Sequence, residues 1–192
     1  MIDFNFKNNT PIQSGSILIS EPFATDDYFE RSVIFICSHN EEGSFGFVIN
    51  NFIDADIGDF VDDFPSIQTR LSIGGPVDTS NLFYYHTFGQ KIEGSLPINK
   101  NIYLGGDFND VKALLKKEPD AVTRIRFFVG YSGWEIKQLD EEISSQSWIV
   151  INNYTEELIF NTSNNNLWKE ILQRQGEKFK IISQFPLNPN DN

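Results

Sequence analysis

Residues 129–142 read VGYSGWEIKQLDEE, a stretch that joins two glycines, two aromatic residues and an acidic run. It follows an apolar segment that is typical of a strand, and Ile136, Leu139 and Ile143 then recur at helical spacing. A turn from a strand into a helix can carry a catalytic serine, cradle an anion or close a corner of the fold.

A catalytic serine on such a turn belongs to a nucleophile elbow, which needs a glycine two residues before the serine and another two residues after it. Ser132 has Gly130 before it, but Trp134 occupies the second glycine position, where its ring would crowd the turn. The two histidines, His39 and His86, both precede the serine, although chain order does not exclude a triad. The motif is broken, and we do not expect a nucleophile elbow.

An anion cradle would use the free backbone amides of a helix that begins near Gly133. The carboxylates of Glu135, Asp140 and Glu141 lie close in sequence and oppose a bound anion. No Lys-Ser or Lys-Thr pair follows the glycines as it does in a P-loop. The stretch therefore matches an anion site poorly.

A structural role explains most of the stretch. Ser132 and Glu135 fit a capping box. In this motif the serine hydroxyl accepts a hydrogen bond from the backbone N–H of the glutamate, and the glutamate carboxylate accepts one from the backbone N–H of the serine. Gly130 and Gly133 let the backbone turn sharply and let Trp134 pack closely. We therefore expect a helix that begins at this serine and buries the apolar stripe that follows.

The rest of the chain mixes strand and helix patterns. Predicted strands occupy residues 15–20, 31–38, 45–50, 70–77, 81–88, 101–106, 124–130, 147–152 and 157–160. Predicted helices occupy residues 56–64, 107–119 and 165–176. Asp107 suits the N-cap of the second helix, and the short connector 39–43 predicts an antiparallel hairpin. We expect an α+β fold with a large, strongly twisted sheet.

The composition suits one globular domain and narrows the function. The 192 residues carry a formal charge of −12 and no basic stripe, so we do not expect direct nucleic-acid binding. Cys37 is the one cysteine, so no disulfide or cysteine-based metal cage forms within the chain, and we expect a cytoplasmic protein. No apolar run is long enough for a membrane span, and the N-terminus has no signal-peptide features.

Several blocks of the sequence resemble the AlgH/YqgE family of bacterial proteins. GYSGWEIKQLDEEI followed by SWIV is similar to the family's hallmark, a Gly-Tyr-small-Gly-Trp run before Gln-Leu-Glu and an acidic helix. The blocks GSILISEPFATDDYFERSVIFICSHNEEGSFGFVIN, IGGPVDTSNLFYYH, YLGGDF and LWKEILQRQG stand in the family's order, so the likeness spans about residues 15–176. Asp140 stands where the family usually has Glu, and Lys137 replaces a small residue.

The resemblance implies a single α+β domain with a coiled, partly split, mostly antiparallel sheet and several packed helices. It implies no established biochemical activity. Its members often carry the label of transcriptional regulator, which comes from genetic association. Nothing in this chain resembles a recognition helix in a basic setting, so we expect any regulatory role to be indirect.

We divide the chain into three parts on these grounds. Residues 1–14 form an N-terminal extension, residues 15–185 form one AlgH-like domain, and residues 186–192 form a polar tail that we expect to be disordered.

The candidate binding surface gathers small residues beside aromatic rings. The Gly-Gly-Pro segment at 74–76 reads as a tight turn whose bare backbone a ligand could approach. The candidate binding residues are Gly130, Tyr131, Ser132, Gly133, Trp134, Gln138, Gly74, Gly75 and Pro76. We expect His86 to be half-buried and structural, and Cys37 to be an inert buried thiol. We assign no catalytic residue, no metal and no cofactor.

The sequence predicts a soluble cytoplasmic binding or regulatory protein that acts indirectly through a protein or small-molecule partner. The alternative is an enzyme of unknown class with a site near Ser132, His86 and Asp140.

Overall fold

The computed structural model describes residue 6, residues 8–22 and residues 28–185, so the predicted tail and most of residues 1–7 lie outside the described residues. The described strands are β1 Ile17–Ser20, β2 Val33–Asn40, β3 Gly43–Val48, β4 Phe52–Ile53, β5 Leu71–Ile73, β6 Val77–His86, β7 Leu96–Pro97, β8 Tyr103–Leu104, β9 Ile125–Trp134 and β10 Trp148–Ile151. The described helices are α1 Phe108–Lys117, α2 Gln138–Ser144, α3 Glu156–Phe160, α4 Leu167–Gln173 and α5 Glu177–Ile182, with the 3₁₀ helices η1 Ile57–Asp59, η2 Gly89–Lys91 and η3 Pro119–Arg124.

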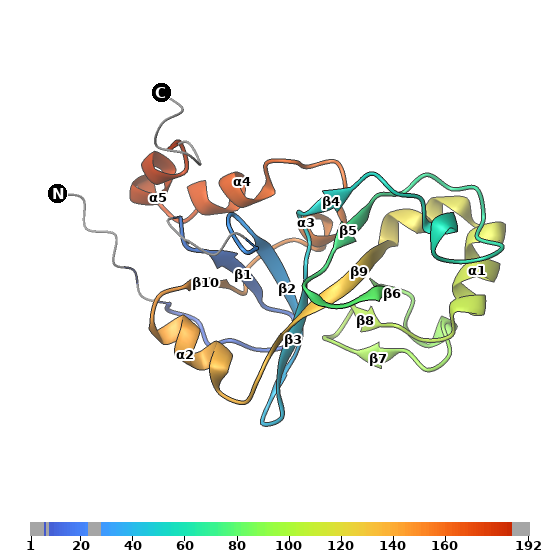
Figure 1. Ribbon diagram of the computed structural model, residues 1–192, viewed down its shortest axis with the longest axis horizontal. Coiled ribbons are helices and arrows are strands. Elements are labelled where there is room, and N and C mark those ends of the chain that lie inside the picture. The colour runs from blue at the N-terminus through green and yellow to red at the C-terminus, as the bar shows by residue number, and fades with distance from the viewer. Residues whose placement is uncertain (1–5, 7, 23–27, 186–192) are drawn as a thin grey trace.

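The strands form one sheet in the order β10-β1-β2-β3-β9-β6-β8-β7, with β4 and β5 attached beside β9 (Figure 1). Every pairing in the described part of the chain is antiparallel except that of β5 with β9. The predicted hairpin is confirmed, since β2 and β3 pair with Asn40 opposite Gly43. The α+β class and the mostly antiparallel sheet are therefore confirmed.

The sheet splits along the long strand β9. One edge of β9 pairs with β6. The other edge pairs first with β5, at residues 127–129, and then with β3, at residues 132–134. β3 and β5 therefore lie end to end along the same edge of β9. The strand β9 thus joins two halves of the sheet, one that contains β3 and one that contains β5 and β6.

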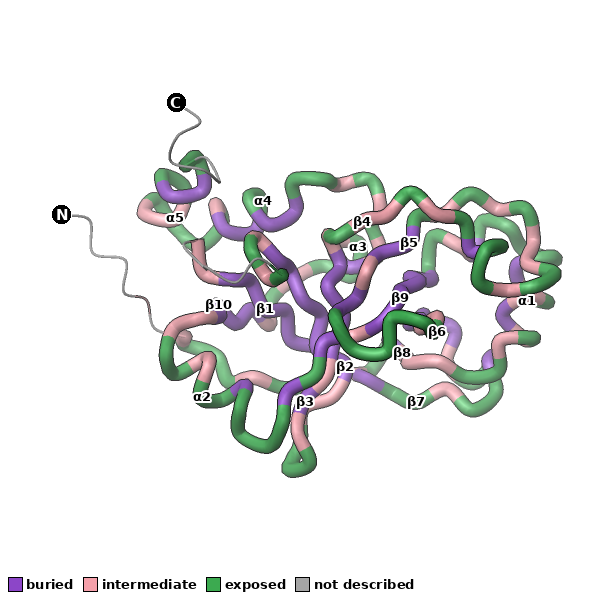
Figure 2. Tube along the Cα trace, viewed as in Figure 1, coloured by how far each residue is buried: buried purple, intermediate pink, exposed green. Residues whose placement is uncertain are grey.

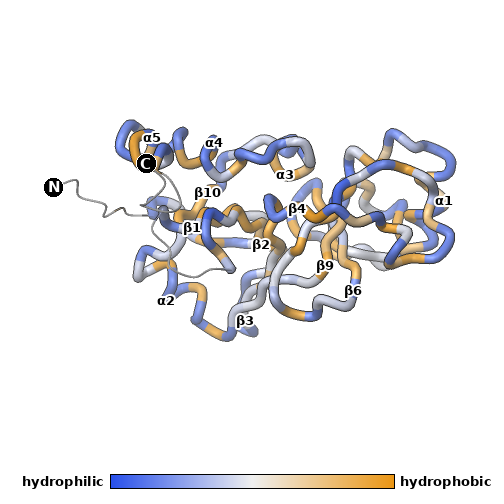
Figure 3. The backbone as a smooth tube through the Cα atoms, turned by 45° about the horizontal axis from the view of Figure 1, so that its top comes forward, coloured by the Kyte–Doolittle hydropathy of each residue, from blue (hydrophilic) through white to orange (hydrophobic). Residues whose placement is uncertain are grey.

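Helices cover both faces of this sheet and enclose three hydrophobic clusters. The helices α3 to α5 lie along one face of β10, β1 and β2, and α2 lies on the opposite face (Figure 3). The first cluster packs Phe35, Phe47 and Phe128 against α4, and the second packs Phe127 against α1. The third packs Trp134 and Trp148 against α2. The strands β1, β2, β9 and β10 are largely buried, whereas β7, the first half of β6 and most connecting loops are exposed (Figure 2).

The predicted helix at 107–119 is confirmed as α1. The Asp107 side chain accepts the Asn109 amide, and Val111 and Leu115 are buried. Lys116 and Lys117 occupy the last turn, where they complement the negative end of the helix dipole.

Two element predictions are wrong. Residues 56–64 form only the 3₁₀ turn η1, because a capping box between Asp56 and Asp59 closes one turn and Asp63 then takes a left-handed conformation, with φ 55°. Residues 157–160 form the helix α3 instead of a strand. A short apolar run does not distinguish the two, and here Glu156 and Glu157 occupy a first helical turn, which favours carboxylates.

Candidate functional site

The Gly-Gly-Pro segment is a crossing of two backbones. The chain leaves β5 at Ile73, passes over β9 and begins β6 at Val77 on the other edge. A Cβ atom on Gly75 would lie 2.0 Å from the Tyr131 carbonyl carbon, and one on Gly74 would lie 2.4 Å from the Gly130 oxygen. The two backbones are so close that no side chain fits at Gly74 or Gly75. The segment predicted as a tight turn is therefore a strand crossover.

Ser132 belongs to this crossover and not to a helix cap. It is buried within β9, and its hydroxyl donates to the Gly74 carbonyl oxygen at 3.0 Å. That oxygen also accepts the Val48 amide at 2.8 Å. The predicted capping box between Ser132 and Glu135 is wrong, because the strand continues to Trp134 instead of ending before the serine.

The helix begins later than predicted. Lys137 precedes it in a left-handed conformation, with φ 65°, and the first helical residue is Gln138. Leu139 is buried, as predicted, but Ile136 lies before the helix and is 62% exposed. The acidic run therefore lies within the helix itself, where Glu142 faces the sheet while Asp140 and Glu141 are exposed.

A carboxylate at the end of this run holds two tryptophans. Glu142 Oε2 accepts the indole N–H of Trp134 at 2.9 Å and that of Trp148 at 2.7 Å. Its second oxygen accepts the Gln138 amide at 2.9 Å, and Gln138 Oε1 accepts the Glu135 backbone amide. We call Trp134, Gln138, Glu142 and Trp148 the tryptophan clamp. Gln138 therefore acts within the clamp, which fixes α2 to the sheet.

An apolar groove of about 910 Å³ opens between the β2–β3 hairpin, the end of β9 and the strands β6 and β8. Its apolar lining consists of Phe45, Val77, Leu82, Phe83, Leu96, Leu104 and Tyr131, beside the Tyr84 and Trp134 positions. The Tyr131 ring lies edge-on to Phe45 and Phe83, with centroids 6.0 and 5.6 Å apart. All three rings are only partly buried, so the groove presents aromatic carbon to solvent.

The polar lining of the apolar groove is acidic or neutral. Glu42 and Glu135 are its charged residues, and Ser38, Asn40 and Ser44 add neutral polar groups. No lysine, arginine or histidine is among the described residues that line it. The groove therefore suits an apolar occupant that carries no negative charge.

The candidate binding residues separate into two groups. Tyr131, Gly133 and Trp134 line the apolar groove, and for them a binding role stays a prediction. The other candidates are outside its lining: Gly74, Gly75, Pro76 and Gly130 at the crossover, Ser132 beneath it and Gln138 in the clamp.

The three residues suggested as an alternative enzyme site do not contact one another. Among the described residues, no hydrogen bond or ion pair joins any two of Ser132, His86 and Asp140. His86 is fully buried, not half-buried as predicted. Its Nδ1 accepts the Phe88 amide, so its Nε2–H donates to the Gly105 carbonyl oxygen at 2.9 Å.

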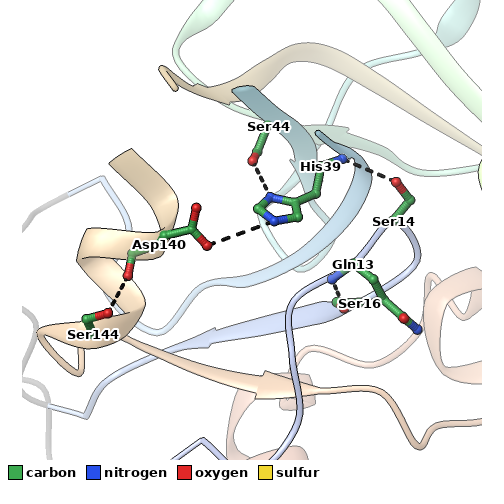
Figure 4. A network of polar contacts seen from close by, with 7 residues as sticks. All are labelled: Gln13, Ser14, Ser16, His39, Ser44, Asp140 and Ser144. Atoms are coloured by element: carbon green, nitrogen blue, oxygen red, sulfur yellow. Dashed lines mark hydrogen bonds and ion pairs between the residues drawn. The ribbon is translucent and has the colours of Figure 1, made fainter. Parts of the chain in front are cut away.

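A serine, a histidine and an aspartate do meet elsewhere, in an arrangement that the sequence analysis missed (Figure 4). His39 Nδ1 lies 2.8 Å from Ser44 Oγ, and His39 Nε2 lies 3.9 Å from Asp140 Oδ1. The first two residues face each other in the hairpin register, which the short connector could have indicated. Ser44 also pairs with Trp134, so it lies between two strands, and the distance to Asp140 exceeds that of a hydrogen bond. The contacts link β2, β3 and α2.

Three further observations bear on the sequence predictions. Cys37 is 5% exposed, so the prediction of a buried thiol is confirmed, and this burial raises its pKa well above the usual value. Within the described ranges, no three His, Cys, Asp or Glu side chains cluster so that they could hold a metal ion. In the same ranges, no helix is both long and apolar enough to cross a membrane.

Comparison with known sequences gives one family. A family model described as AlgH-like matches residues 17–180. A UPF0301 protein of Bacteroides fragilis is 41% identical over 186 residues, which cover 96% of this chain and 94% of that protein. A UPF0301 protein of Bacteroides thetaiotaomicron is 39% identical over 191 residues, which cover 98% of this chain and 96% of that protein.

Comparison with solved structures gives the same fold. The crystal structure of protein DIP2367 from Corynebacterium diphtheriae aligns with a TM-score of 0.73 at 22% identity, covering 94% of this chain and 95% of that one. The solution structure of the AlgH protein from Pseudomonas aeruginosa aligns with a TM-score of 0.71, also at 22% identity, covering 95% and 100%. At this identity the likeness shows a shared fold.

Proposed function

The chain belongs to the AlgH-like family, and we propose that it is a binding protein whose working surface is the apolar groove. The observation that carries the proposal is the groove's lining of half-buried rings and aliphatic side chains. Its volume of about 910 Å³ lies within the range of ligand sites, which is roughly 300–1,000 Å³. Burial of this exposed apolar carbon by a partner would supply the binding free energy.

Regulation by this protein is then indirect, through the partner that occupies the groove. A formal charge of −12 opposes contact with a nucleic-acid backbone. A cytoplasmic setting suits a chain whose one cysteine is buried and reduced.

The test measures occupancy of the apolar groove with Nile red, a neutral dye that brightens in apolar surroundings. We expect saturable binding to the full chain. Tyr131→Ala removes the central ring and Leu96→Ser removes an aliphatic side chain from the rim, so each should weaken dye binding severalfold. Leu96 is 62% exposed, and its substitution should leave the fold intact.

The matched control is Ile181→Ser on α5. Ile181 is also an exposed aliphatic residue, at 51%, but it lies outside the groove lining. Unfolding in urea verifies that each variant remains folded. Absent dye binding, or binding that both groove variants leave unchanged, would remove the proposal.

A further inference from the structure

The charged residues of the apolar groove are gathered at one end. Ser44 pairs with Trp134, so Gly43 lies close to Glu135, the residue that follows β9, and Glu42 precedes Gly43 at the hairpin tip. The approach is close, because a Cβ atom on Gly43 would lie 2.6 Å from the Trp134 carbonyl oxygen. The two carboxylates therefore mark the same end of the groove.

Neither carboxylate forms an ion pair with another described residue. Within the part of the chain that the structure describes, the ion pairs join His39 to Asp140 and Lys180 to Glu177, and neither Glu42 nor Glu135 takes part. Like charges at the same end of a groove repel each other, and a bound cation would relieve that repulsion. The net charge of −12 would also attract a cationic partner from a distance.

The apolar surface continues past the groove onto its rim. Leu96 on β7 and Val77 on β6 are 62% and 38% exposed, and Ile136, which follows Glu135, is 62% exposed. Ile136 lies outside the lining, so a small ligand inside the groove would leave its side chain in water. A segment of a protein chain is long enough to cover the groove and its rim together.

The groove also offers a polar group for orientation. Among the described residues, none forms a hydrogen bond with the Tyr131 hydroxyl, although its ring is packed between Phe45 and Phe83. A tyrosine with a fixed ring and an unpaired hydroxyl can bury apolar area and still bond a partner's backbone.

We propose that the apolar groove binds a segment of a partner protein in which apolar side chains lie beside a lysine or arginine. The apolar side chains contact the rings and the aliphatic rim, and the cation lies between Glu42 and Glu135. This inference rests on the proposed function and adds the chemistry of the partner to it.

The experiment compares three short synthetic peptides on the full-length protein. The first combines Leu, Phe and Lys, the second has Glu for every Lys, and the third has Ser for every Leu and Phe. Each peptide competes with Nile red, and its affinity is measured at low and at physiological salt. We expect the first peptide to bind at least roughly tenfold more tightly than either counterpart, with an affinity that falls as salt rises.

A charge-matched pair of variants locates the cation. Glu42→Gln combined with Glu135→Gln should remove most of the preference for the lysine peptide. Glu118→Gln combined with Glu141→Gln changes the net charge equally at exposed positions outside the lining and should keep the preference. Glycine amides at 43, 94, 105, 106 and 133 line the groove, and their NMR signals should shift when the lysine peptide is added.

The outcomes separate the two proposals. Equal affinity for the lysine and glutamate peptides, with dye displaced by both, would overturn the charge preference and leave groove binding standing. If a simple hydrophobic amine displaced the dye as effectively as the lysine peptide, the occupant would be a small molecule and the inference would be wrong. Failure of dye and peptides alike would remove both proposals.

Discussion

Arg126 shows how one residue joins several segments in the interior. The side chain is fully buried in β9, and burial lowers its pKa. Its guanidinium donates to the carbonyl oxygens of Ile159 and Ile49, at 3.2 and 2.9 Å, and to Ser72 Oγ at 2.9 Å. The centroid of the Phe128 ring lies 5.3 Å from the guanidinium carbon of Arg126. These oxygens come from α3, from Ile49 directly after β3, and from β5, so the buried cation links three segments to the central strand.

His86 makes the stability depend on pH. Burial lowers its pKa below the ordinary 6.5, although the hydrogen bond to Gly105 opposes this. The Phe88 amide donates to Nδ1, so protonation there would break that bond. The unfolded chain therefore binds more protons below about pH 6.5, and the free energy of unfolding is at its full value above that pH and falls as the pH drops through it.

Urea unfolding between pH 7.5 and 5.5 checks this prediction. The wild-type free energy of unfolding should decrease over this interval, and His86→Gln should flatten the decrease. A slope that His86→Gln leaves untouched would mean that other groups titrate.

The role of a residue was predictable only where it depends on interactions with residues nearby in sequence. Asp107 caps α1 as predicted, because a cap acts on the amides that directly follow it. Ser132 was assigned to a cap as well, yet its hydroxyl bonds Gly74, which is 58 positions away in sequence. A single sequence does not reveal that contact, since it arises only when β5 crosses β9.

At the scale of elements, the tryptophan clamp determines where α2 lies. The helix is seven residues long, which is too short to be stable alone. It buries Leu139 against the sheet, and Glu142 accepts both indole N–H groups. The Trp134 and Trp148 rings are also edge-on, with centroids 6.1 Å apart. Glu142, at the end of the acidic run, thus supplies the contact that holds the helix.

Glu142→Ala should lower the free energy of unfolding by roughly 2–4 kcal/mol, because two nearly buried indole N–H groups lose a charged acceptor. Glu142→Gln keeps one acceptor oxygen and should cost less. Urea unfolding followed by circular dichroism measures both. Glu141→Ala, an exposed glutamate on the same helix, is the matched control, and an equal loss in that variant would contradict the clamp.

Long elements with a clear period were predictable, and short ones were not. α1 and the β2–β3 hairpin match the prediction because their patterns persist over several residues. The segment 157–160 became α3 because tertiary contacts, including burial of Ile159, decide so short a run. The apolar groove was only partly foreseen, through Tyr131, Gly133 and Trp134, because its other walls come from β6 and β8.

At the scale of the whole molecule, β9 makes the two halves of the sheet depend on each other. It contributes Phe128 to the first hydrophobic cluster, Ile125 and Phe127 to the second and Trp134 to the third. Neither half can lose its packing without disturbing a strand that the other half uses. We therefore expect one cooperative unfolding transition.

Phe127→Ala tests this expectation, since Phe127 is fully buried in the second cluster and all three tryptophans of the chain lie in the other two. The substitution should lower the free energy of unfolding by about 3–5 kcal/mol. Tryptophan fluorescence and far-ultraviolet circular dichroism should shift to lower urea together, because β9 transmits the loss to clusters that the substitution does not touch. A fluorescence transition that stays at the wild-type midpoint, while circular dichroism shows an earlier second step, would mean that the halves unfold independently.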